Sequence, residues 1–376
     1  MASDYASISR YNEEQLGKDR ASRMTQVAMY ADTAHFIYEL LQNADDVDAD
    51  EISFAVYSDQ LVVEHNGAPF NEKNVKSISY FGKGKTDITK IGHFGLGFKS
   101  VFAYTASPRI HSGSESFEIT ELYSIAPFPN PNDLDQAWTR FVLPFDHHIK
   151  KPNYIEHRKL KSPTDAQKEI TEKLCKLGAD ALLFTKSLRT INMKSDGVSI
   201  YCRRTDCRID DEVREVVIAT TDTPTQCFLV FDRSVFWADD RGDKKEYRPV
   251  QIAYGLTKPL ADGGAIKRLV GTHLHVFFPT DKETHHGIIL QGPYRTTPAR
   301  DNLPEDDDFN KHLVSETAPL LAQSLHRLKT LNLLGLDALA ALPLDHERFL
   351  PGTFFHPLHT CVRHELTTKQ LLPAAE

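Results

Sequence analysis

A carboxylate, a carboxamide and a second carboxylate stand at short spacing near the start of the chain. Glu39, Asn43 and Asp46 lie in the stretch ELLQNADD. Spacings of four and then three residues place all three side chains on one face of a helix. A carboxylate can serve as a general base, and a carboxamide oxygen suits a hard divalent cation. The stretch therefore predicts a polar helix face that could carry chemistry.

A glycine-rich turn follows about fifty residues later. Residues 92–99 read GHFGLGFK, and we expect a helix from Phe98 to about Tyr104. Glycines let a phosphate chain approach the backbone closely, and the N–H groups at a helix start attract anions. The spacing GxxGxG is not that of a P-loop, nor does the turn follow a Rossmann-type first strand. Taken together with ELLQNADD, it predicts a nucleotide site.

Hydrophobic periodicity predicts the elements that must position these residues. The helix that carries Glu39 should run from about Thr33 to Ala44, with Asp32 as its N-cap. A strand hairpin should follow, and then a polar loop whose centre, FGKGKT at 81–86, could act as a closing lid or be a solvated surface loop. The elements expected up to residue 176 are a helix at 11–29, strands at 51–57 and 61–64, a turn at 65–70, a loop at 71–90, strands within 109–125 and at 139–145, a loop at 126–136, and a helix at 164–176.

The second half of the chain reads as a new run of strands followed by helix. We place a domain boundary near residue 185. The elements expected beyond residue 180 are strands at 181–184, 188–193, 227–231, 247–254, 273–279 and 288–291, a hairpin turn at 195–197, and a helical region at 309–339. The last residues show no clear core pattern. Short hairpin connections favour an α+β fold with a mostly antiparallel sheet.

Composition limits the classes of protein that fit. The 376 residues carry a net charge of −8, with 40% hydrophobic and 26% charged residues, which is ordinary for a globular chain of about two domains. No basic surplus marks a dedicated nucleic-acid binder. The polar start and the lack of an apolar run of about 18 residues give no signal peptide or membrane helix. Five scattered cysteines fit reduced thiols, so we expect a cytoplasmic protein.

Three of these segments resemble the successive boxes of a known superfamily. ELLQNADD, the strand ending in Asn66-Gly67, and IGHFGLGFKSVF are similar to the boxes of the Bergerat-fold ATPases, which include gyrase, the ninety-kilodalton heat-shock chaperone, histidine kinases and MutL. The forms QNADD, NGAPF and GFKSVF look most like the sacsin and NO VEIN branch. The resemblance implies a two-layer α/β ATP-binding domain at 1–185, an S5-like middle domain at 186–305, and a helical region and tail at 306–376.

The resemblance assigns roles to the polar helix face. Glu39 is implied as the general base that activates water, Asn43 as a ligand to Mg²⁺, and Asp46 as a support for the base of the pocket. Arg300, in the loop TTPARDN, is implied as the second-domain cation that reaches the γ-phosphate and so takes part in catalysis. The cofactors implied are ATP and Mg²⁺.

A second set of residues is implied to form the phosphate wall of the pocket. Glycines of the turn would cradle the β- and γ-phosphates, and Lys99 would add positive charge. Lys85 belongs to the lid segment. The nucleotide contacts expected in this part of the chain are Lys85, Gly92, Gly95, Leu96, Gly97, Phe98 and Lys99.

The adenine end of the pocket departs from the superfamily pattern. Most members have Asp two residues before the box glycine Gly67, and here that position is His65. A neutral imidazole nitrogen or the Asn66 carboxamide could accept a hydrogen bond from the adenine amino group, although neither equals a carboxylate. Thr139 is the expected adenine-side threonine, and Thr272 is the competing candidate.

These observations predict an ATP-binding, slowly hydrolysing, Mg²⁺-dependent conformational switch of the chaperone-like type, forming the N-terminal part of a larger protein. One alternative is a regulatory scaffold that binds nucleotide without hydrolysis. Another is the ATPase module of a DNA-processing or defence system. By analogy with the superfamily, we expect a homodimer formed through the first domain, with residues 10–30 as the exchanging segment. The partner we expect is a protein client or further domains of a longer chain. DNA is possible but not indicated, and we expect no membrane partner.

Overall fold

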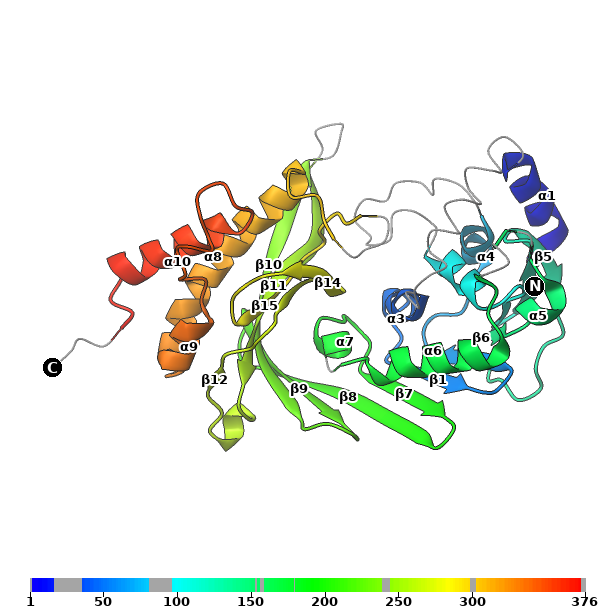
Figure 1. Cartoon of the computed structure of the whole chain (residues 1–376), viewed down its shortest axis with the longest axis horizontal. Coiled ribbons are helices and arrows are strands. Elements are labelled where there is room, and N and C mark those ends of the chain that lie inside the picture. The colour runs from blue at the N-terminus through cyan, green and yellow to red at the C-terminus, as the bar shows by residue number, and fades with distance from the viewer. Residues whose placement is uncertain are drawn as a thin grey trace.

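The described strands of the chain form one long mixed sheet (Figure 1). The computed structural model describes residues 2–16, 36–80, 97–152, 154–155, 159–178, 180–238, 244–297 and 302–372. The strand order is β5-β4-β3-β6-β2-β1-β7-β8-β9-β10-β11-β15-β13-β14, and β12 pairs with β11. The strands are β1 (Glu51–Val56), β2 (Gln60–His65), β3 (Arg109–Ser112), β4 (Glu115–Thr120), β5 (Ser124–Pro127), β6 (Thr139–Pro144), β7 (Thr190–Ser195), β8 (Val198–Arg208), β9 (Val213–Thr220), β10 (Gln226–Ala238), β11 (Lys244–Leu256), β12 (Ile266–Lys267), β13 (His273–Val276), β14 (Phe278–Glu283) and β15 (Ile288–Gln291).

Helices cover this sheet in two groups. In Figure 1, α8, α9 and α10 lie beyond β10 and β11, on the side away from α3 and α7. The helices are α1 (Tyr5–Leu16), α3 (Phe36–Asp46), α4 (Glu72–Ser79), α5 (His147–Lys150), α6 (Pro163–Cys175), α7 (Asp180–Leu183), α8 (Asp308–Thr330), α9 (Leu336–Ala341) and α10 (His356–Thr368), with 3₁₀ turns η1 (Phe98–Ala103) and η3 (Leu260–Asp262). The α+β fold class and the mostly antiparallel sheet are confirmed. Among the described strands, the parallel pairs are β1 with β7 and β13 with β15.

Two hydrophobic cores lie on opposite faces of the sheet, and β10 contributes to both. Phe228 and Val230 belong to the core beneath α3 and α6, whereas Leu229 and Phe231 belong to the core beneath α8 and α10. Alternation along one strand follows from the two-residue period of a β-strand. A strand buried on both faces explains why this segment reads as a continuous apolar run.

Helix α3, which carries Glu39, Asn43 and Asp46 (the polar triad), forms because of the apolar stripe expected from the sequence. Phe36, Ile37, Leu40 and Leu41 make an apolar stripe on α3, and all four are buried in the first core. The expected hairpin follows as β1 and β2, in which Phe54 pairs with Val63. Gly67 closes the turn after β2, where a Cβ atom would lie 2.6 Å from Cγ2 of Val47. Glycine at this position allows the chain to pass close to the end of α3.

Three elements expected between residues 71 and 184 were wrong. Residues 72–79, expected in a loop, form α4, because Asn71 and Asn74 make a reciprocal capping box and Val75 packs into the core. The expected strand at 181–184 is the short helix α7, since a brief apolar run does not distinguish the two structures. The helix expected from Phe98 is a 3₁₀ helix rather than an α-helix.

The second half contains more regular structure than expected. Strands β8 and β9 and helix α10 were not expected. The C-terminal segment, expected to lack a core pattern, buries Leu358 and Val362 of α10 in the second core. The sheet also crosses the boundary expected near residue 185, because β7 pairs in parallel with β1. The expected helix at 11–29 corresponds to α1 in its first residues, and Asp32 lies outside the described residues.

Candidate functional site

The two segments that suggested a nucleotide site meet at Glu39 and Gly97. Glu39, on α3, is only 8% exposed. A Cβ atom built on Gly97, at the start of η1, would lie 1.8 Å from Oε2 and 2.5 Å from Cδ of Glu39. Gly97 has the ordinary right-handed helical conformation (φ −55°, ψ −54°), so glycine serves here to provide space rather than an unusual dihedral angle. The candidate base therefore lies directly against the end of the glycine-rich turn.

The rest of the polar triad continues along α3. Asn43 lies one turn after Glu39 and is exposed, so its carboxamide is accessible to a ligand. Asp46 ends the helix and forms an ion pair with Arg248 of β11. This ion pair joins α3 to a strand about 200 residues later in the chain, and the expected support of the pocket base by Asp46 stays a prediction.

Asp45, next to Asp46, was not singled out by the sequence. Its side chain is fully buried, and its carboxylate accepts hydrogen bonds from the backbone N–H groups of Lys186, Ser187 and Leu188 at 2.7–3.0 Å. These contacts fix the end of α3 to the chain that leads into β7. The repeated acid in QNADD was the available signal, but helical spacing from Glu39 selects only one of the two.

His65 is the residue that the sequence predicts at the adenine end. A hydrogen bond from Gly67 determines which of its ring nitrogens is an acceptor and which is a donor. The backbone N–H of Gly67 donates to Nδ1 of His65 at 3.1 Å. Burial lowers the pKa of His65 to about 4, so the ring is neutral at pH 7 and its proton resides on Nε2. Nδ1 is therefore already used as an acceptor. Of the two acceptors considered for the adenine amino group, the imidazole thus already accepts at Nδ1, and its remaining nitrogen is a donor.

The side chain of Asn66 forms hydrogen bonds with the residues at the start of β1. Its Oδ1 accepts from the backbone N–H groups of Asp50 and Glu51, each at 3.1 Å, and its Nδ2 donates to the Asp50 carboxylate. Because both its oxygen and its nitrogen already form hydrogen bonds, this carboxamide can form few further hydrogen bonds to a nucleotide base. Asn66 thus holds the hairpin and Gly67 in place, in contrast to its expected role in reading adenine.

Thr139 lies beside His65, whereas Thr272 does not. Thr139, on β6, is directly opposite His65 in the register of β2 and β6, and its hydroxyl is 2.5 Å from that of Ser112. The hydroxyl of Thr272 forms a hydrogen bond with that of Thr284 near β14, in the second half of the sheet. Of the two candidate threonines, the structure brings Thr139 to the His65 end of the first sheet half.

The side chain of Lys99 is buried in the core. Its ammonium group is buried and donates to the backbone carbonyls of Ser79 and Leu122, and burial lowers its pKa to about 7. These two hydrogen bonds tie α4 to η1, and the expected contact of Lys99 with phosphate stays a prediction. Phe98 packs on Phe141, with ring centroids 5.8 Å apart. The expected contacts Lys85, Gly92, Gly95, Leu96 and Arg300 lie outside the described residues.

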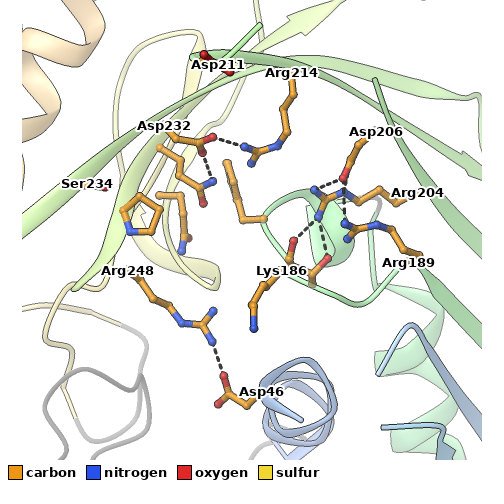
Figure 2. Close-up of a pocket in the computed structure, with 15 residues that line it drawn as sticks. Asp46, Lys186, Arg189, Arg204, Asp206, Asp211, Arg214, Asp232, Ser234 and Arg248 are labelled. Carbon is orange, nitrogen blue, oxygen red and sulfur yellow. Dashed lines mark hydrogen bonds and ion pairs between the residues drawn. The ribbon is translucent and has the colours of Figure 1, made fainter. Parts of the chain in front are cut away.

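A polar cleft of about 810 Å³ adjoins the end of α3 (Figure 2). Its cations are paired with carboxylates: Arg204 and Arg189 share Asp206, Arg214 pairs with Asp232, and Arg248 pairs with Asp46. Lys186, which also lines the cleft, pairs with Asp48. Because each positive charge already has a partner, the cleft holds little net charge with which to attract an anion. Among the described residues, no group of three or more histidine, cysteine, aspartate or glutamate side chains is arranged to hold a metal ion.

Comparison with known proteins relates the chain to two large proteins. It is 23% identical to protein NO VEIN of Arabidopsis thaliana over 348 residues, covering 86% of this chain and 12% of that protein. It is 33% identical to human sacsin over 105 residues, covering 23% of this chain and 2% of sacsin. The chain thus spans a small part of either relative. Its similarity to the sacsin and NO VEIN branch is confirmed.

Other comparisons are less informative. No family model matches the chain. A solved structure described as the N-terminal domain of a DNA repair protein aligns with a TM-score of 0.40 and 8% identity, covering 74% of this chain and 90% of that one. Within the described ranges, no helix is both long and apolar enough to cross a membrane.

Proposed function

We propose that this chain is a Mg²⁺-dependent ATP-binding module of the Bergerat type that hydrolyses ATP slowly and acts as a conformational switch. The observation that carries the proposal is the contact between Glu39 and Gly97. It joins the polar helix face and the glycine turn, two segments separated by more than fifty residues, in one place. Similarity to NO VEIN and sacsin supports the same branch of proteins.

The residues present fit a magnesium nucleotide. Asn43 offers an exposed neutral oxygen one helical turn from Glu39, and Mg²⁺ is commonly held by few protein ligands together with water and phosphates. Gly97 leaves space where any side chain would collide with Glu39. When bound, the metal would neutralise charge that builds up on the transferring phosphate.

The chemistry that this chain supplies is the positioning of a base. Glu39 is nearly buried, so access of bulk water to its carboxylate is restricted. In that position it can orient one water molecule and accept its proton, a role that contributes about 10²–10⁴-fold to rate in enzymes. Asp45 holds the end of α3 through three backbone N–H groups, which keeps the helix face in register.

The adenine end supports a different mode of base recognition from the usual carboxylate. His65 offers a donor on Nε2, and Thr139 lies on the neighbouring strand. A donor at this position suits an acceptor atom of a base rather than its amino group. We therefore propose weaker selection for adenine than in relatives with aspartate at this position.

The test measures ATP binding by calorimetry and phosphate release in the same buffer with Mg²⁺. Glu39→Gln should bind ATP and lower turnover by about 100-fold, because it removes the base and retains the shape. Gly97→Ala should also lower turnover, since the new methyl group displaces the end of a flexible side chain rather than the backbone. Gly335→Ala is the matched control, because a Cβ there meets nothing within 4 Å.

Each outcome decides a separate point. Absence of ATP binding by the wild-type protein would refute the proposed function as a whole. Binding without phosphate release would make the chain a nucleotide-binding module rather than an enzyme. Equal turnover in Glu39→Gln and wild type would remove Glu39 as the base.

A further inference from the structure

Helix α3 contacts the second half of the sheet through an aromatic pair. Tyr38 is adjacent to Glu39 on α3, and its ring lies 4.4 Å from that of Phe278 at the start of β14. Phe278 in turn contacts Phe277 edge-on at 4.8 Å. Phe277 joins β13 to β14 with a positive φ of 71°, a costly conformation for a bulky residue. Surrounding contacts must therefore hold this turn in place.

Arg248 supplies the second contact between the same elements. Its guanidinium lies over the ring of Phe277 at 5.3 Å and forms an ion pair with Asp46. It also lies 3.9 Å from Asp45, the residue that fixes the end of α3. Figure 2 shows Arg248 reaching across the cleft toward Asp46. One side chain thus connects β11, the β13–β14 turn and the helix that carries Glu39 and Asn43.

Other charged pairs at the cleft do not make this connection. Arg214 and Asp232 both belong to the second half of the sheet, on β9 and β10. Lys186 pairs with Asp48 just beyond α3, but both side chains are 67% exposed, and exposed pairs contribute little. Arg248 is only 25% exposed, so its pairing is better shielded from water.

We propose that Arg248 is a positioning residue for the reaction, which sets the orientation of α3 from the second half of the chain. The inference rests on the proposed ATPase function and goes beyond it, because it assigns control of the Glu39 and Asn43 face to β11, which reaches α3 through the acids at the helix end. Docking of β11 and the β13–β14 turn would bring the helix face into the arrangement needed for turnover. Nucleotide binding, which uses other contacts as well, would depend on this docking much less.

The test compares Arg248→Gln, Arg248→Lys and Arg214→Gln in the full chain. Arg214→Gln is the matched control, since it breaks an ion pair at the same cleft without touching α3. For Arg248→Gln we expect about tenfold lower kcat, the effect of losing one charge-assisted hydrogen bond, and a change in ATP affinity below about threefold. Arg248→Lys keeps the charge and should recover most of the turnover. Arg214→Gln should match the wild-type protein.

Hydrogen exchange of residues 36–46 without nucleotide separates this inference from the ATPase proposal. Exchange in that segment should rise in Arg248→Gln and stay unchanged in Arg214→Gln, whether or not ATP is hydrolysed. Equal exchange in the two variants would overturn the positioning role. So would a lower melting temperature in Arg248→Gln with wild-type kcat per folded molecule. If the wild-type protein binds no ATP, the proposed function fails and the exchange measurement alone decides the role of Arg248.

Discussion

Burial gives two residues of the first half of the chain chemistry that differs from what their positions in the motifs imply. Lys99 follows the glycine turn directly, yet its ammonium group lies in the core on two backbone carbonyls. His65 stands where the resemblance implies a carboxylate, and burial keeps its ring neutral. The position of Lys99 next to a motif does not determine where its side chain points. In the same way, the position of His65 does not determine whether its ring is protonated. Both depend on neighbours distant in sequence.

His65 should make stability depend on pH. Its pKa is lowered from 6.5 in the unfolded chain to about 4 in the folded protein, so the unfolded state binds more protons between these values. The stability it preserves is complete above pH 6.5 and is lost as pH falls toward 4. When the pH falls from 7 to 5, the contribution of His65 should lower the free energy of unfolding by about 2 kcal/mol.

Urea unfolding of the wild-type protein and His65→Asn at pH 7 and 5 measures this effect. Asparagine retains an acceptor for the Gly67 N–H but does not titrate, so the loss on acidification should be smaller in the variant by about 2 kcal/mol. His346→Asn, at an exposed position, should leave the pH dependence unchanged. An identical pH dependence in His65→Asn and wild type would contradict the assignment.

At the scale of elements, the ends of α3 depend on contacts that local sequence does not specify. The apolar stripe of Phe36, Leu40 and Leu41 was predictable from its spacing, and so were the β1–β2 hairpin and the meeting of Glu39 with the glycine turn. Arg248 was not, because no local pattern connects β11 to a helix 200 residues earlier. Helical periodicity also selected Asp46 over Asp45, although the buried one makes the backbone contacts.

Asp45 should therefore be far more important for stability than its neighbours. Asp45→Ala leaves three backbone N–H groups of residues 186–188 without their acceptor, and we expect a loss of about 4 kcal/mol. Asp48→Asn is the control: it removes the ion pair with the exposed Lys186 but keeps an acceptor for the Ser187 hydroxyl and a residue type that tolerates the positive φ of 58° at this position, so the loss should stay below about 1 kcal/mol. Denaturant midpoints compare the two directly. Similar losses would show that the 186–188 segment is held by other contacts.

At the scale of the whole molecule, one continuous sheet crosses the domain boundary expected near residue 185. The question is whether residues 1–185 can fold stably without the strands that follow. Strand β7 follows that boundary and still pairs with β1, from Glu51 with Thr190 to Ala55 with Lys194. Ile191 and Met193 of β7 are buried in the first core, together with Val216 and Ile218 of β9. The pattern of turns and apolar runs marked a boundary because it cannot show that a later strand returns to an earlier one.

This pairing predicts different behaviour for two fragments of the chain. A fragment of residues 1–185 removes β7 and leaves β1 as an unpaired edge, with part of the first core exposed. Unpaired edges promote association between chains, so this fragment should aggregate or unfold without a cooperative transition. A fragment of residues 1–222 retains β7, β8 and β9, so its unpaired edge moves to β9 while β1 and more of the first core stay covered; it should aggregate less than the shorter fragment and unfold with a sharper thermal transition. Light scattering and circular dichroism distinguish them. If the shorter fragment is as monomeric and cooperative as the longer one, the boundary near residue 185 separates two independent domains, and the β1–β7 pairing contributes little to the first.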